Sequence, residues 1–213
     1  MPPAGEASLL PRPQRGAAMT RTVLLVRHGT HAEVGRVLSG RSDIALDARG
    51  RREAEALAAA LEGVPIATLH SSPRTRARET IAPIAARRAL PVTVAPALDE
   101  IDFGGFTGRS FDSLAADPDW QRWNAERGTA RCPGGETMKE ASDRALSYLH
   151  GLGADDSPAL CVTHCDVIRA VVVRALGLGF ERMLAFDCDP ASRTTLQIGD
   201  GGMRIVALNE RVR

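Results

Sequence analysis

The chain has 213 residues, of which 44% are apolar and 25% are charged, proportions that are typical of a soluble globular domain. Its 27 basic residues nearly balance its 26 acidic ones, and the formal charge of +1 gives no overall field to attract nucleic acid or an anionic membrane. The longest apolar stretch is interrupted by Arg169, Arg174 and Arg182, and it falls short of the roughly 18 residues that a membrane span requires.

The cysteines give no sign of an oxidising compartment. They contain no Cys-x-x-Cys pair, and no secretory segment precedes them. The four are Cys132, Cys161, Cys165 and Cys188. We therefore expect reduced thiols in a soluble, cytoplasmic protein. The expected partner is a small charged molecule, with no nucleic acid or membrane partner and with a possible homodimer.

The first predicted elements lead to a histidine. Residues 1–18 carry several prolines and few apolar side chains, which predicts a disordered extension before one domain over 19–213. Residues 22–26 are β-rich and apolar, as a buried parallel strand should be, and they end at the tripeptide Arg27-His28-Gly29. Asp47 is expected to cap a helix that continues to Leu61.

Strands and helices alternate along the rest of the chain. We expect a strand over 66–71, a helix from Pro73 to about Ala89 with a kink at Pro83, a strand over 92–94, a helix over 136–152, a strand over 159–163, a helix over 167–176, and a hairpin of 194–198 and 204–208. This order predicts a three-layer α/β/α sandwich with a mainly parallel central sheet. Ligands bind beyond the carboxyl ends of strands in such sheets, so residues that follow strands should converge there.

The tripeptide at 27–29 has the chemistry of a phosphate site. Glycine allows a tight turn and a close approach of a ligand to the backbone. Arg27 offers charge-assisted donors to a phosphoryl oxygen. His28, when neutral, can attack phosphorus through one ring nitrogen if the proton on the other nitrogen is held. The alternative is a histidine that only caps the end of the strand.

A second candidate segment carries arginines at alternate positions. Arg74, Arg76 and Arg78 follow the second strand and open a helix. A step of two residues turns a helix by about 200°, so the three cannot all face one ligand. Either one of them belongs to a binding site, or the segment is an ordinary solvated basic helix that pairs with Glu79.

Two further segments supply an acid and a second histidine. Glu100 lies among apolar and small residues over 98–106, where burial could raise a carboxyl pKa and produce a general acid. An exposed acidic loop is the alternative. His164 lies between a strand and a helix, where the helix amino end suits an anion, and it would donate to and stabilise charge on a phosphate. The alternative there is that Asp166 caps the helix.

Taken in order, these motifs resemble those of the histidine phosphatase superfamily, also called the phosphoglycerate mutase-like family, over about 23–209. The family pattern has Arg-His-Gly, Ser-x-x-x-Arg-Ala-x-x-Thr, Leu-x-Glu-x-x-x-Gly and a second histidine after a strand. Residues 133–136 also look like the family's Pro-Gly-Gly-Glu turn. The resemblance implies a phosphoglycerate mutase-like fold with no metal and no cofactor. It implies these roles: His28 as phosphorylated nucleophile, Glu100 as proton donor, Arg27, Arg76 and His164 as the phosphate pocket, and Glu136 as a possible substrate contact.

The resemblance implies hydrolysis of a small phosphate monoester in two steps through a phosphohistidine. His31 and Cys165 depart from the family pattern without removing a core role. The asparagine that mutases carry near Val34 is absent, and the stretch between Glu100 and Gly134 is shorter than in mutases, so a phosphatase of the broad or alpha-ribazole phosphatase-like kind is favoured. The alternatives are phosphoglycerate mutase-type transfer and, from another class, a non-catalytic phosphate-ligand sensor or interaction module.

Other phosphate chemistries fit the sequence less well. A cysteine-dependent phosphatase needs five residues between its thiolate and its arginine, but Cys165 and Arg169 are separated by three and Cys188 and Arg193 by four. An aspartyl-phosphate motif would begin at Asp187, but the threonine that should follow is absent. The sequence therefore favours neither cysteine-dependent nor aspartyl-phosphate chemistry.

Overall fold

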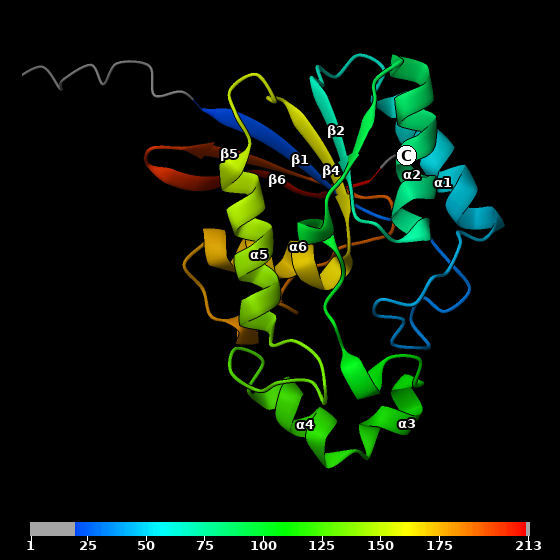
Figure 1. The fold of residues 1–213 in the computed structure, drawn as a ribbon, viewed down its shortest axis with the longest axis vertical. Helices are drawn as coiled ribbons and strands as arrows, with labels where there is room; N and C mark the ends of the chain where they lie inside the picture. Colours follow the sequence, from blue (N-terminus) through cyan, green and yellow to red (C-terminus); the bar gives the residue numbers. More distant parts are fainter. Residues whose placement is uncertain (1–19, 212–213) are drawn as a thin grey trace, which may run out of the picture.

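The computed structural model of the protein describes residues 20–211, and the extension expected over 1–18 lies outside them. Six strands form one sheet in the order β3-β2-β4-β1-β5-β6 (Figure 1). They are β1 (Arg21–Arg27), β2 (Thr68–Ser71), β3 (Val92–Val94), β4 (Ala159–Thr163), β5 (Arg193–Gly199) and β6 (Gly202–Glu210). The first four are parallel, whereas β5 pairs antiparallel with β1 and β6. The predicted mainly parallel sheet is confirmed.

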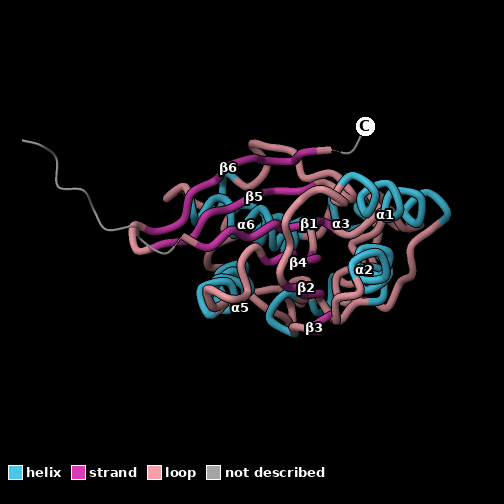
Figure 2. The backbone as a smooth tube through the Cα atoms, turned by 90° about the horizontal axis from the view of Figure 1, so that it is seen from above, coloured by secondary structure: helices cyan, strands magenta, loops and turns pink. Residues whose placement is uncertain are grey.

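Helices cover both faces of this sheet, as the prediction of three layers requires. Figure 2 places α1 and α2 on one side and α5 and α6 on the other. Their bounds are α1 (Ala48–Ala60), α2 (Thr75–Arg88), α5 (Met138–Gly151) and α6 (Cys165–Ala175). None of the helices within residues 20–211 is long and apolar enough to cross a membrane.

The central strand β1 is buried on both faces, because its apolar residues alternate between two cores. Val23 and Leu25 pack with residues of α5 and α6. Leu24 and Val26 pack with residues of α1 and α2. Strand β4 lies beside β1 and is fully buried, so the carboxyl ends of both strands open at the same edge. That edge is where the sequence placed His28 and His164.

Two helix starts differ from the predicted boundaries for local reasons. The helix expected over 136–152 begins later, because the Thr137 side chain and the Glu140 side chain form a capping box at its start. Helix α6 begins directly after His164, which occupies the N-cap position. The alternative in which Asp166 caps this helix is therefore wrong, since Asp166 already lies in the first turn.

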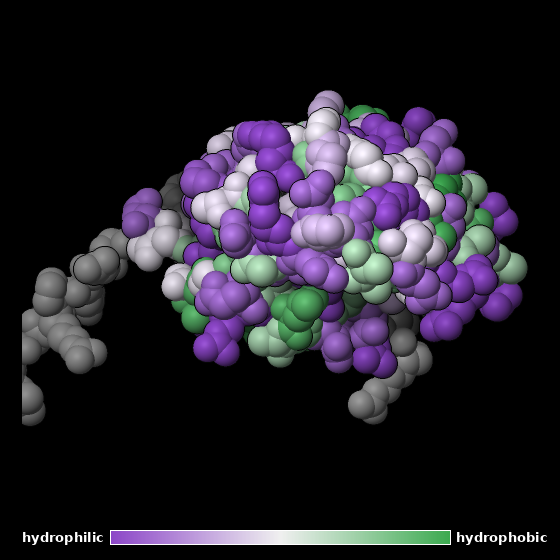
Figure 3. Space-filling view, turned by 90° about the horizontal axis from the view of Figure 1, so that it is seen from below, coloured by the Kyte–Doolittle hydropathy of each residue, from purple (hydrophilic) through white to green (hydrophobic). Residues whose placement is uncertain are grey.

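A smaller unit that the sequence left unassigned extends from the sheet at the lower end of Figure 1. It contains α3 (Phe111–Ala115), α4 (Pro118–Ala125) and the 3-10 turn η2 (Gly104–Phe106). Trp123 anchors it, stacked on Trp120 with ring centroids 5.2 Å apart and edge-on to Phe103 at 5.6 Å. The face seen from below is mostly hydrophilic, with hydrophobic residues between hydrophilic ones (Figure 3).

The start of α1 presses directly on the loop that follows β1. Asp47 caps α1 as predicted, and its own backbone N–H donates to the Thr30 carbonyl at 3.1 Å. A Cβ on Gly50 would lie 2.0 Å from that carbonyl oxygen, and a Cβ on Gly29 would lie 2.8 Å from the carbonyl of Gly50. Gly29 is therefore needed for contact with α1, which the tripeptide alone did not indicate.

This contact predicts that Gly50→Ala destabilises the protein. The new methyl group would overlap a backbone atom that cannot rotate away, so we expect the free energy of unfolding in urea to fall by about 2 kcal/mol or more. Gly63→Ala is the matched control, because a Cβ there meets nothing within 4 Å. Equal unfolding free energies for the two variants would contradict the close packing of α1 on the loop.

Candidate active site

Residues from distant parts of the chain surround one cavity of about 300 Å³ at the carboxyl edge of the sheet. Arg27 and His28 come from the end of β1, Arg76 from α2, and Glu100 from the segment after β3. His164 lies directly behind them, with its ring centroid 5.2 Å from that of His28. The structure thus brings together the five residues that the sequence singled out for phosphate chemistry.

The rest of the cavity wall includes both apolar and polar side chains. The apolar side chains are Val34, Val37, Leu38, Phe103 and Phe111. Cys165, Asp166 and Arg169, all from the first turns of α6, are among the polar ones. A ligand held at His28 would therefore meet both apolar surface and charge beyond its reacting group.

His28 is held as a neutral ring with one free nitrogen. Its side chain is buried, and its Nδ1 lies 2.8 Å from the carbonyl oxygen of Gly29. A carbonyl only accepts, so this contact places the proton on Nδ1 and leaves a lone pair on Nε2. Burial first, and then the charges of Arg76 and Arg27, hold the pKa of His28 well below its ordinary value. The ring is therefore unprotonated at Nε2 near neutral pH.

Arg76 is a buried guanidinium with three fixed contacts. Its Nη1 donates to the Ser42 carbonyl at 2.9 Å, and its Nη2 donates to the Gly40 carbonyl at 2.6 Å. The same Nη2 lies 3.1 Å from Nδ1 of His164. These contacts fix the plane of the guanidinium in the wall of the cavity. Arg76 is only 1% exposed.

Arg27 and Arg76 both keep donors that the protein does not use. Nη1 of Arg27 donates to the Cys188 carbonyl at 2.6 Å. The buried Nε of Arg27 and the buried Nε of Arg76 have no hydrogen-bond acceptor among the residues that the structure describes. Buried N–H groups are nearly always paired, so two arginines that line the cavity and keep unpaired donors have the chemistry to bind an anionic ligand.

The three alternate arginines separate as the helix geometry requires. Arg76 faces the cavity, whereas Arg78 is exposed. Arg74 is half-buried and pairs with Asp99, with Nε 3.0 Å from Oδ1. One arginine of the three therefore belongs to the cavity, and the interpretation of the segment as only a solvated basic helix is wrong.

Glu100 lies in the cavity wall in a form that can donate a proton. Its side chain is largely buried, and its Oε1 accepts from the Ile101 backbone at 3.0 Å. Burial is the main cause that raises the pKa of Glu100 to about 8, and the nearby charge of Asp166 raises it further. The carboxyl is therefore protonated at neutral pH, and the alternative of an exposed acidic loop is wrong for this residue.

Glu136 is placed away from the cavity. Its carboxylate pairs with Arg41 at 3.0 Å and with Arg144 at 3.1 Å. It also accepts from the Asp102 backbone at 3.1 Å. These partners hold the two segments 99–102 and 133–136 together, and a contact between Glu136 and substrate stays a prediction.

One histidine of the cavity, His31, was not among the predicted site residues. His31 lines the cavity, is only 5% exposed, and has its ring centroid 5.2 Å from that of His28. Burial, followed by the charge of Arg76, lowers the pKa of His31 to about 4. Its position three residues after His28 was the only signal, and it was noted merely as a departure from the family pattern. Within residues 20–211, no group of three or more His, Cys, Asp and Glu side chains could hold a metal ion.

Known proteins that resemble this chain include ones named as phosphatases and as a probable phosphoglycerate mutase. The family model described as histidine phosphatase superfamily (branch 1) matches residues 23–211. The chain is 34% identical to "Probable phosphoglycerate mutase GpmB" of Salmonella choleraesuis over 73% of this chain and 75% of that protein. It is 28% identical to "Phosphoserine phosphatase 1" of Hydrogenobacter thermophilus over 88% and 91%. The solved alpha-ribazole phosphatase from Shigella flexneri matches with a TM-score of 0.75 and 26% identity, covering 90% of this chain and 97% of that one.

The protonation of Glu100 can be measured directly. In ¹³C NMR of labelled glutamate side chains, one carboxyl should lose its proton near pH 8, and Glu100→Gln should lack that signal. The folded-state pKa lies above the ordinary value of 4.5, so the stability that the proton contributes is complete below about pH 4.5 and is lost as the pH rises through about 8. The free energy of unfolding of the wild type should therefore fall over this range relative to that of Glu100→Gln. A carboxyl that titrates near 4.5 would contradict the burial of this group.

Proposed function

The chain belongs to the histidine phosphatase superfamily, and we propose that it is a phosphohydrolase that acts on a small phosphate monoester through a phosphohistidine intermediate. The arrangement around His28 carries the proposal. A ring nitrogen with a free lone pair, two unpaired arginine N–H groups and a protonated carboxyl line one cavity. These are the nucleophile, the anion donors and the acid that transfer of a phosphoryl group requires.

In the first step, His28 attacks the phosphorus of the ester. Its Nε2 lone pair forms the P–N bond while the bond from phosphorus to the ester oxygen breaks. The proton of Glu100 passes to that departing oxygen, so the product leaves as a neutral alcohol. The guanidinium groups of Arg27 and Arg76 stabilise the charge on the three remaining phosphoryl oxygens, and burial strengthens this interaction.

In the second step, water takes the place of the alcohol. The carboxylate of Glu100 accepts a proton from water as the water oxygen attacks phosphorus. The P–N bond breaks, inorganic phosphate is released, and His28 and Glu100 return to their starting forms. The same carboxyl therefore serves first as acid and then as base.

Phosphoglycerate mutase-type transfer is the second candidate, and a specific observation favours it. The relative with 34% identity is named as a probable phosphoglycerate mutase. A mutase would use the same first step but return the phosphoryl group to a second alcohol. We favour water as the acceptor because the asparagine expected near Val34 in mutases is absent and the segment between Glu100 and Gly134 is short.

The phosphatase proposal predicts turnover that depends on His28. The purified wild type should release p-nitrophenol from p-nitrophenyl phosphate without added metal, and His28→Ala should lower kcat by about 10⁴-fold or more. His150→Ala is the matched control, since that histidine is exposed on α5. A wild type without turnover, or a His28→Ala variant at the wild-type rate, would contradict the proposal and favour a non-catalytic phosphate-binding module.

A second assay separates the hydrolase from the mutase. With 3-phosphoglycerate and 2,3-bisphosphoglycerate supplied together, we expect free phosphate as the main product, measured by ³¹P NMR. Dominant formation of 2-phosphoglycerate would contradict the hydrolase proposal and support mutase-type transfer.

A further inference from the structure

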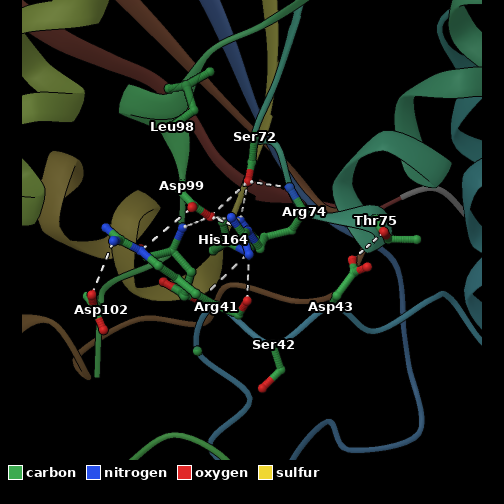
Figure 4. A network of polar contacts seen from close by, with 12 residues as sticks. Arg41, Ser42, Asp43, Ser72, Arg74, Thr75, Leu98, Asp99, Asp102 and His164 are labelled. Carbon is green, nitrogen blue, oxygen red and sulfur yellow. Dashed lines mark hydrogen bonds and ion pairs between the residues drawn. The ribbon is translucent and has the colours of Figure 1, made fainter. Parts of the chain in front are cut away.

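A series of four buried side chains leads from Arg76 in the cavity wall to an acid, and Figure 4 shows its last three members, His164, Ser72 and Asp99. Arg76 contacts Nδ1 of His164 at 3.1 Å, and Nε2 of His164 lies 2.7 Å from Oγ of Ser72. Oγ of Ser72 in turn lies 3.4 Å from Oδ1 of Asp99. The exposed fractions are 1% for Arg76, 0% for His164, 0% for Ser72 and 6% for Asp99. Water therefore competes little for these contacts.

The chemistry of each group fixes the direction of the hydrogen bonds. A guanidinium has only donors, so Nδ1 of His164 must accept from Arg76. Burial and the charge of Arg76 keep the pKa of His164 well below its ordinary value, so the ring carries one proton, and that proton is on Nε2. Nε2 then donates to Oγ of Ser72, and the hydroxyl proton of Ser72 is left for Asp99.

Asp99 is held firmly as the last acceptor of the series. Nε of Arg74 lies 3.0 Å from its Oδ1, and Nε of Arg41 lies 3.6 Å from its Oδ2 (Figure 4). The Glu100 backbone donates to the same Oδ1 at 2.8 Å. Arg74 and Asp99 occupy positions that the family motifs leave open.

We propose that Asp99 is a positioning residue, which through Ser72 keeps the proton of His164 on Nε2 and so preserves the acceptor that holds Arg76. The inference rests on the proposed function, because Arg76 matters there as a donor to the transferred phosphoryl group. Without the acceptor at Asp99, the Ser72 hydroxyl has Nε2 of His164 as its remaining acceptor in the described part of the chain, and by donating to it the hydroxyl opposes the Nε2 proton that the Arg76 contact favours. The proton of His164 then moves to Nδ1, where it faces an N–H of Arg76, and two donors oppose each other in a buried site.

The test compares variants at two acids that contact the same arginine. Asp99→Ala removes the acceptor, whereas Asp99→Asn keeps an oxygen in its place. Asp102→Ala is the control, since Asp102 pairs with Arg41 at 3.3 Å and has no contact with Ser72. Two quantities are measured for each variant, namely kcat/KM for p-nitrophenyl phosphate and the ¹⁵N NMR shifts of the His164 ring, assigned by the signal that His164→Gln lacks.

We expect Asp99→Ala to lower kcat/KM by about 10- to 100-fold and to move the proton of His164 to Nδ1. Asp99→Asn should keep both kcat/KM and the proton position of His164 close to those of the wild type, and Asp102→Ala should change neither. A wild-type proton position in Asp99→Ala overturns the proposal whatever its turnover, because the loss would then be merely structural. Equal effects of Asp99→Ala and Asp102→Ala also overturn it.

A second variant and the NMR measurement keep the role of Asp99 testable if Asp99→Ala does not fold or the wild type shows no turnover. If Asp99→Ala does not fold, Ser72→Ala breaks the series one contact nearer to His164, and a wild-type kcat/KM in that variant overturns the proposal. The NMR measurement needs no turnover. A wild type that does not hydrolyse phosphate esters would therefore refute the proposed function, while the position of the His164 proton would still decide the role of Asp99.

Discussion

The buried guanidinium of Arg76 is the charge around which the candidate site is organised. A cation without solvent must be given acceptors by the protein, and Arg76 finds them in the carbonyls of Gly40 and Ser42 and in the ring of His164. Its charge also lowers the pKa of the neighbouring histidines, His28 among them. The same residue thus has a donor for an anion and, together with burial, keeps His28 unprotonated.

Burial acts in opposite directions on His28, the proposed nucleophile, and on Glu100, the proposed proton donor. It lowers the pKa of His28, whose charged form is a cation, and it raises the pKa of Glu100, whose charged form is an anion. One buried environment therefore produces a neutral imidazole beside a protonated carboxyl. The Gly29 carbonyl selects which nitrogen of His28 is free, and the packing of α1 on residues 29–30 holds that carbonyl in place. Fold and chemistry are linked through these few contacts.

The sequence predicted well those parts whose signal is local. The apolar run over 22–26, the Asp47 cap and the histidines after strands needed only periodicity and position. The segment 102–132 could not be derived, because α3 and α4 are short and are held by contacts such as that of Trp123 with Phe103. Family spacing selected Arg76 over Arg74, but the partner of Arg74 at Asp99 is visible only in three dimensions. The position of His31 in the cavity wall is likewise visible only in three dimensions.

The account depends most on a covalent bond between phosphorus and His28, and trapping that bond tests it most directly. Wild-type protein is mixed with a ³²P-labelled phosphate ester and quenched within milliseconds in alkali, where a phosphohistidine survives, and the labelled peptide is then identified. The account predicts acid-labile label on His28 that disappears when unlabelled substrate is added as a chase. No label, or label on another side chain such as Cys165 or Asp166, would contradict it.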